Sequence, residues 1–177
     1  MKTIKFCEAC SVKDDCGEDL MPQHLFIDGD AEKADENKAS CDLIFETGKT
    51  VFFIEQKYLY YFCRFYEDSR RWESLRNVVR DKIKGSVEDY FNPPKNIEKA
   101  LKFLLVYSKK VKPSHPRGKY QFEEIEKYIG SAALLNDIRT ALLAIDGVVG
   151  GVYHTDDYSV ALSVSECSDV EKQIFKL

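Results

Sequence analysis

The sequence contains no apolar run close to the roughly 20 residues that a transmembrane helix needs, so we expect no membrane span. Its first residues, MKTIKFCEAC, hold one short apolar patch and lack the longer apolar stretch and small-residue cleavage site of a secretory signal. We therefore expect a cytoplasmic location. Because that compartment is reducing, the six cysteines are not expected to form a framework of disulfide bonds.

Marks of several enzyme classes are also missing. The three histidines are scattered, and neither a Ser/His/Asp nor a Cys/His grouping is recognisable by spacing. There is no glycine-rich loop that would cradle a phosphate, because Gly147, Gly150 and Gly151 lie between a predicted helix and a predicted strand, where a turn or bulge is expected. These absences argue against a hydrolase of the triad type and against a nucleotide-binding loop.

The length of 177 residues suits one domain with a sizeable core, and the mixture of 44% hydrophobic and 32% charged residues is typical of a globular protein. Residues 1–40 form a mostly polar, cysteine-containing region, which is either part of the same domain or a small metal-stabilised extension. Residues 41–177 carry the patterns of strands and helices and are predicted to form the core, its C-terminal helices and a last hairpin.

Apolar periodicity predicts an α/β (mixed α+β) fold with a central mixed sheet flanked by helices. Residues 43–45 and 51–54 read as two strands joined by a turn at Gly48 and Lys49. A long amphipathic helix follows and ends at residues 92–94, Asn-Pro-Pro. Further predictions are strands at 25–27 and 101–107, helices at 123–128 and 131–145, and a hairpin of residues 148–153 and 158–164. The stripe of the long helix consists of Phe65, Trp72, Leu75, Val79, Ile83, Val87 and Tyr90.

The first hairpin brings chemically active side chains together. With Gly48 and Lys49 at its tip, facing residues have numbers that sum to 97, so Asp42 is predicted to lie opposite Glu55. Lys57 follows Glu55 by two residues and shares its side of the strand. Two facing carboxylates repel each other unless a cation lies between them, and such oxygen ligands suit Mg²⁺ or Mn²⁺. The alternative is structural, with Asp42 capping a strand or holding a turn.

Asp42, a hairpin, Glu55-Gln56-Lys57 at the end of an apolar strand and a following helix resemble the PD-(D/E)XK nuclease superfamily over about residues 40–107. The resemblance implies a restriction-endonuclease-like core in which Asp42 and Glu55 bind the metal and Lys57 is the catalytic basic residue. The chain departs from the family pattern at Cys41, where many members have Pro. Many members also carry an acidic residue on a helix before the hairpin, for which the candidates are Glu8, Glu32 and Glu36.

Charge is unevenly distributed along the chain, which has a net charge of −4. Residues 61–120 contain 15 Lys+Arg and 7 Asp+Glu, a balance of +8, whereas the rest contains 11 and 23, a balance of −12. A local basic segment can bind a polyanion even on an acidic chain. The alternative is a set of solvated helix faces. The candidate phosphate contacts are Arg76, Arg80, Lys109, Lys110 and Lys112.

Three cysteines lie close together near the N-terminus, and the first two have the spacing that lets two thiolates grip one metal. They are Cys7, Cys10 and Cys16, with Cys41 or His24 as a fourth candidate ligand. Zinc, or alternatively an iron–sulfur cluster, would stabilise this region. A second C-x2-C pair is absent from the sequence, and free thiols are the competing interpretation.

Together these patterns predict a Mg²⁺- or Mn²⁺-dependent nuclease in which Asp42, Glu55 and Lys57 carry the chemistry, with DNA favoured over RNA as the substrate. A small nuclease that cuts both strands would often act as a homodimer. The alternative hypothesis is a nuclease-like fold used as a binding or adaptor module without catalysis.

Overall fold

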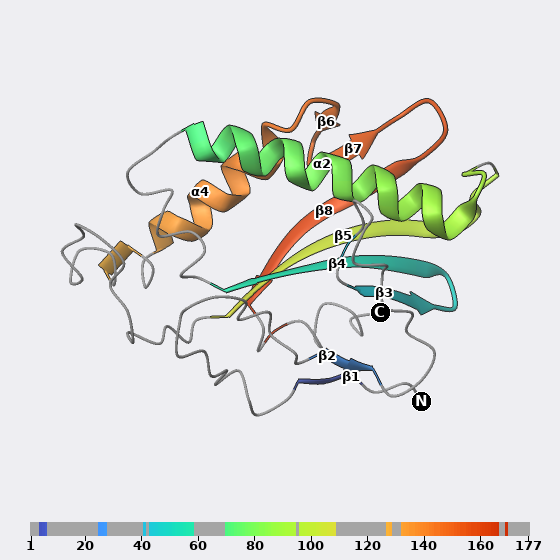
Figure 1. Cartoon of the computed structure of the whole chain (residues 1–177), viewed down its shortest axis with the longest axis horizontal. Helices are drawn as coiled ribbons and strands as arrows, with labels where there is room; N and C mark the ends of the chain where they lie inside the picture. Colours follow the sequence, from blue (N-terminus) through green and yellow to red (C-terminus); the bar gives the residue numbers. More distant parts are fainter. Residues whose placement is uncertain are drawn as a thin grey trace.

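The structure, a computed structural model of the chain, describes residues 4–6, 25–27, 41, 43–58, 70–94, 96–108, 127–128, 132–166 and 169. Within these residues the fold is mixed α/β, as the sequence predicts. A sheet of six strands has the order β3-β4-β5-β8-β7-β6, and two helices lie on one of its faces (Figure 1). Strands β1 (Ile4–Phe6) and β2 (Leu25–Ile27) form a separate antiparallel pair.

The hairpin of β3 (Leu43–Thr47) and β4 (Thr50–Tyr58) confirms the predicted register. Leu43 pairs with Ile54 and Thr47 with Thr50, so facing residues sum to 97. The β-branched and aromatic residues of β4 suit a pleated, buried strand. Strand β5 (Ala100–Ser108) lies parallel to β4. The amide of Ala100 donates to the carbonyl oxygen of Lys49 at 2.9 Å, which ties the hairpin tip to the start of β5.

Helix α2 (Arg70–Phe91) connects β4 to β5. The predicted stripe is confirmed at Leu75, Val79, Ile83 and Val87, which are buried. The helix ends before two consecutive prolines, since proline lacks an amide hydrogen and restricts the residue before it. Helix α4 (Ala132–Leu143) is rich in the strong helix formers Ala and Leu and confirms the prediction for 131–145.

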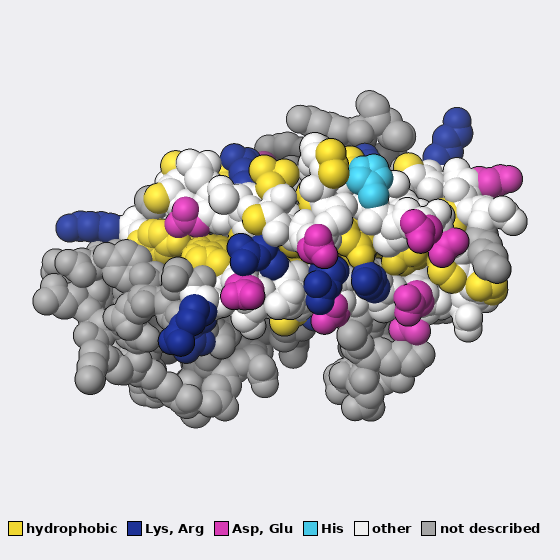
Figure 2. All heavy atoms as spheres, turned by 90° about the horizontal axis from the view of Figure 1, so that it is seen from above, with side chains coloured by type: hydrophobic (Ala, Val, Ile, Leu, Met, Phe, Trp, Pro, Cys, Tyr) yellow, Lys and Arg dark blue, Asp and Glu magenta, His cyan; other side chains and the backbone are white. Residues whose placement is uncertain are grey.

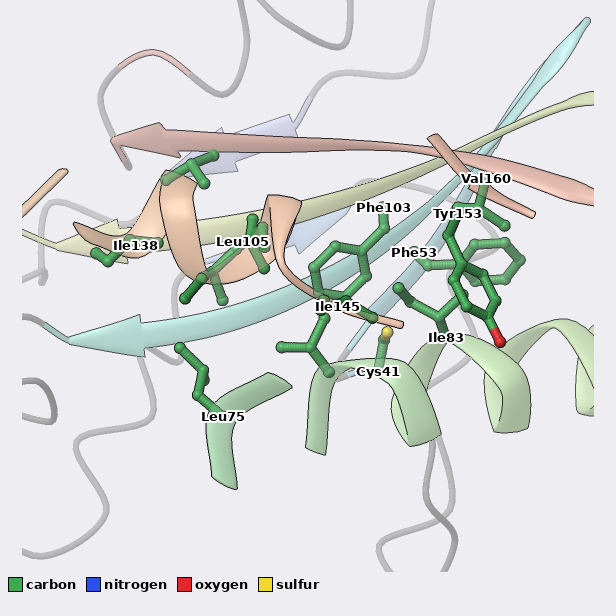
Figure 3. Packing of buried hydrophobic residues seen from close by; sticks show 14 of the residues in the cluster. Cys41, Phe53, Leu75, Ile83, Phe103, Leu105, Ile138, Ile145, Tyr153 and Val160 are labelled. Atoms are coloured by element: carbon green, nitrogen blue, oxygen red, sulfur yellow. The ribbon is translucent and has the colours of Figure 1, made fainter. Parts of the chain in front are cut away.

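The core lies between this helical layer and the sheet. Figure 3 shows Phe53, Phe103 and Leu105 pointing from β4 and β5 toward the helices, where Ile83 of α2 and Ile138 of α4 meet them. Each of these five side chains is fully buried. Burying side chains of this size contributes roughly 1.5–3 kcal/mol apiece, so this layer fixes how the helices lie on the sheet.

The last part of the chain differs from its prediction in one respect. Residues 148–153 were expected to form one strand, but the structure has β6 (Val148–Val149) and β7 (Val152–His154) paired with each other. Gly150 and Gly151 between them have φ values of 59° and 79°, and a type I′ turn requires positive φ at both central residues. Strand β8 (Ser159–Glu166) then pairs with β7 on one side and runs parallel to β5 on the other.

Candidate functional site

The carboxyl end of β4 carries the two described members of the predicted triplet. Glu55 and Lys57 alternate with Ile54 and Gln56, so they share the helix-covered face with Phe53. Lys57 Nζ donates to Glu55 Oε1. Their predicted placement on one side of the strand is therefore confirmed. Asp42 lies outside the described residues, and its pairing with Glu55 stays a prediction.

A third charged group reaches the same carboxylate from helix α2. Lys82 Nζ donates to Glu55 Oε2 at 2.7 Å, so each oxygen of Glu55 has an ammonium partner. The Glu55 side chain is only 1% exposed, whereas Lys57 and Lys82 are 16% and 22% exposed. A buried carboxylate without partners would be strongly destabilising, and these ion pairs offset that cost. We refer to Glu55, Lys57 and Lys82 as the Glu55 cluster.

The turn of α2 that carries Lys82 is also bonded to the residue that precedes Asp42. The amide of Cys41 donates to Ser86 Oγ at 2.7 Å, and both groups are buried. The Cys41 thiol, itself 0% exposed, lies 3.9 Å from the carbonyl oxygen of Lys82. The entry of the chain into β3 is thus held against the turn of the helix that supplies the second ammonium.

A row of paired residues that begins at Lys57 runs across three parallel strands. Lys57 of β4 pairs with Tyr107 of β5, and Tyr107 pairs with Glu166 of β8. All three lie near the carboxyl ends of their strands, on the face that the helices cover. The Glu55 cluster therefore lies at the carboxyl ends of three adjacent parallel strands.

The described groups can be tested for their fit to the predicted Mg²⁺ or Mn²⁺. Within the described part of the chain, no three His, Cys, Asp or Glu side chains are placed to hold a metal ion. Glu55 supplies carboxylate oxygens of the kind these ions prefer, but both are ion-paired with lysines. A metal site here thus needs a second carboxylate, for which Asp42 is the predicted source, and it needs one ammonium to give way.

The predicted phosphate contacts on α2 do not converge on Glu55. At about 100° of rotation per residue, Arg80 and Arg76 lie about 160° and 120° around the helix from Lys82. Arg80 Nε instead lies 3.2 Å from Asp81 Oδ1, and both side chains are partly exposed. Seen from the helix side, Lys and Arg alternate with Asp and Glu over the described surface (Figure 2). Lys109, Lys110 and Lys112 lie outside the described residues.

Of the cysteines predicted as metal ligands, the structure describes only Cys41. Its thiol is buried in the apolar core, among side chains that include Ile83 (Figure 3). Three other candidate ligands, Cys7, Cys10 and Cys16, lie outside the described residues, as do His24 and the acidic candidates Glu8, Glu32 and Glu36.

A second carboxylate of the hairpin has a comparable set of partners at the opposite end of the sheet. Glu46 of β3 accepts hydrogen bonds from Tyr90 Oη of α2 and from Lys99 Nζ. Glu46 is 38% exposed and Lys99 is 34% exposed. We refer to Glu46, Tyr90 and Lys99 as the Glu46 cluster.

Sequence reasoning missed Lys82, Tyr107 and Glu166 as neighbours of the site. Lys82 carried one usable indication, because it borders the apolar stripe three residues after Val79, and a buried Glu55 requires cationic partners. Tyr107 and Glu166 carried none, since their pairing depends on the register of parallel strands that are far apart in the sequence.

Comparison of the chain with protein-family models, curated proteins and solved structures finds no match. Among the described residues, no helix is both long and apolar enough to cross a membrane.

Proposed function

We propose that this chain is a metal-dependent nuclease with its site at the carboxyl end of β4. The observation that carries the proposal is Glu55, a fully buried carboxylate ion-paired with Lys57 two residues further along the strand. Burying a charge is energetically costly even when it is ion-paired, so a carboxylate kept at such a position is a candidate for a functional role.

In the proposed site, Asp42 and Glu55 hold Mg²⁺ or Mn²⁺. The hairpin register supports the pair, because the pairing of Leu43 with Ile54, if continued by one residue, would set Asp42 against Glu55. The bound ion would supply Lewis-acid polarisation of a phosphate and a lower pKa for a coordinated water. The restriction-endonuclease-like core inferred from residues 40–107 belongs to the same proposal. Its support is the succession of hairpin, helix α2 and parallel strand β5.

Lys57 takes the role of the catalytic basic residue. Its ammonium donates to Glu55, which holds it in place, and its side chain is 16% exposed, which leaves it within reach of a substrate phosphate. From there it can orient the attacking water and stabilise negative charge that develops on the phosphate. DNA is the proposed substrate, with the basic residues of 61–120 contacting the backbone.

The test uses a plasmid, duplex and single-stranded oligonucleotides and RNA, each incubated with Mg²⁺ or Mn²⁺. The wild type should cut DNA, and Lys57→Ala should lower the rate at least about 100-fold. Lys49→Ala is the matched control, because Lys49 is an exposed residue at the tip of the same hairpin. If the wild type leaves every substrate intact in both metals, the nuclease proposal is wrong.

A second candidate function is a nuclease-like module that binds without cutting. One observation favours it, namely that both oxygens of Glu55 have ammonium partners within the protein itself. A site satisfied in this way needs no metal for its integrity. Under this alternative, the wild type shifts DNA in a gel but leaves it uncut, and Lys57→Ala leaves the shift unchanged.

A further inference from the structure

The face of the sheet that points away from the helices is apolar and buried as well. Strand alternation sets every second residue of β4 and β5 on this far face. Its apolar members on these strands are at most 4% exposed, and they are Phe52, Ile54, Leu104 and Val106. In β5 the two faces together make an unbroken apolar run, which is typical of a strand buried on both sides. The far face is therefore a second core that another part of this chain covers.

Lys102 covers one end of the far face. Its Nζ lies over the ring of Phe52, 5.5 Å from the ring centroid, and the lysine is itself partly exposed. Further along the strands, Ile54, Leu104 and Val106 are each no more than 1% exposed. The two described helices lie on the opposite face of the sheet, so a different element covers these three side chains (Figure 1).

Strands β1 and β2, which we call the N-terminal ribbon, have the position and the pattern for this role. In Figure 1 they lie on the side of the sheet away from α2 and α4. The two entirely apolar residue pairs of the ribbon share one of its faces by alternation, and they are Ile4 with Ile27 and Phe6 with Leu25. The pair between them, Lys5 with Phe26, belongs to the other face. An isolated pair of strands is marginally stable at best in water, so the ribbon needs an apolar surface to pack against.

We propose that the N-terminal ribbon packs its apolar face on the far face of the sheet and closes this second core. The N-terminal region thus belongs to the same domain as the sheet and is not a separate metal-stabilised extension. The ribbon and α2 hold β4 from opposite sides, and β4 is the strand that carries Glu55 and Lys57. The proposal does not depend on the nuclease function, because it rests on packing alone.

The direct test measures how well the far face is protected from a thiol-alkylating reagent in the full chain. Leu104→Cys places a thiol on this face, and its alkylation in the native protein is followed by peptide mass spectrometry. Adding Phe6→Asp, which sets a charge on the apolar face of the ribbon, should speed alkylation at position 104 at least about 10-fold. Phe26→Asp is the matched control, because it makes the same change on the other face of the ribbon. It should leave the rate unchanged.

Leu105→Cys controls for a general loss of structure. Leu105 is fully buried on the helix-covered face, so alkylation at this position should stay slow when Phe6→Asp is added. If Phe6→Asp opens both faces, Phe6→Ala replaces it as the milder change. Acceleration that is still not confined to position 104 would overturn the proposal.

Thermal unfolding of the full chain gives a second readout. Phe6→Asp should unfold at least about 5 °C below the wild type, because it buries a charge in the second core, and Phe26→Asp should stay within about 2 °C of the wild type. Equal shifts for the two variants would contradict the assignment of the ribbon's faces. Unchanged protection of Leu104→Cys in the presence of Phe6→Asp would show that another segment covers the sheet.

Discussion

The two ends of the β3–β4 hairpin place a carboxylate beneath the same helix and give each two donors. Glu55 accepts hydrogen bonds from Lys57 and Lys82, and Glu46 accepts them from Tyr90 and Lys99. The partner sets look alike, yet the exposure of the two carboxylates differs, at 1% for Glu55 and 38% for Glu46.

This difference in exposure decides what each cluster can do. Exposed ion pairs contribute only about 0–1 kcal/mol, because water screens the charges and solvates them when the pair opens. Breaking a buried pair costs about 3–5 kcal/mol, because it leaves a charge without compensation. The Glu46 cluster is thus an ordinary surface clamp, and the Glu55 cluster holds a charge that the fold would otherwise exclude. Burial, rather than the number of partners, marks Glu55 as the candidate site.

The largest predicted effect separates the two carboxylates directly. Glu55→Gln should lower the free energy of unfolding by about 3 kcal/mol in chelator, because the partly buried ammonium groups of Lys57 and Lys82 both lose their ion pair with Glu55. Glu46→Gln should lower it by less than about 1 kcal/mol, because its partners are solvated. Urea unfolding monitored by circular dichroism measures both. Equal losses for the two variants would contradict the distinction drawn from burial.

A smaller effect compares two hydroxyl groups that lie one turn apart near the C-terminal end of α2, one bonded to Cys41 and the other to Glu46. Ser86→Ala leaves the buried amide of Cys41 without its acceptor and should cost about 1–2 kcal/mol, after the better helix propensity of alanine is counted. Tyr90→Phe removes the donor to Glu46 at a half-exposed position and should cost about 0.5–1 kcal/mol.

The same pair of variants also tests the proposed function, because Cys41 precedes Asp42. Ser86→Ala should lower DNA cleavage, whereas Tyr90→Phe should leave it at the wild-type rate. A loss of cleavage in Tyr90→Phe would show that the ends of the sheet are not independent.

The smallest effect concerns pH at the Glu46 end, where β8 begins. Burial, followed by the charges of Tyr153, Glu88 and Asp157, raises the pKa of Tyr158 to about 12. Between about pH 10 and pH 12 the unfolded chain releases this proton and the folded chain keeps it. Stability therefore falls as the pH rises through that window, by an amount that solvent screening of this partly exposed group keeps small.

Tyr158→Phe should remove this contribution. Urea unfolding at about pH 9 and about pH 11 should show a smaller loss of stability for Tyr158→Phe than for the wild type. If the two proteins lose the same amount, burial of Tyr158 does not govern the response of this end of the sheet to high pH.

Much of the site was predictable because its rules are local. The turn at Gly48 and Lys49 sets the register of the hairpin, and strand alternation sets Glu55 and Lys57 on one face. Burial of Glu55 was not predictable from its own strand, because burial depends on which helix covers it. The two-residue turn at Gly150 and Gly151 divides the predicted strand 148–153 into β6 and β7. The sequence did not predict this division, although both glycines were expected to serve a turn or bulge.

The sequence by itself determined the hairpin, its pairing and the apolar stripe of α2, because short-range periodicity and turn chemistry act between neighbours in the chain. Only the tertiary structure decided that Lys82 meets Glu55, 27 residues earlier in the chain. Packing of Leu75, Val79 and Ile83 against the sheet fixes the rotation of α2 about its axis, and that rotation selects which lysine reaches the buried carboxylate. The order β4-β5-β8 was likewise decided by packing, since parallel strands pair over distances along the chain that no local pattern encodes.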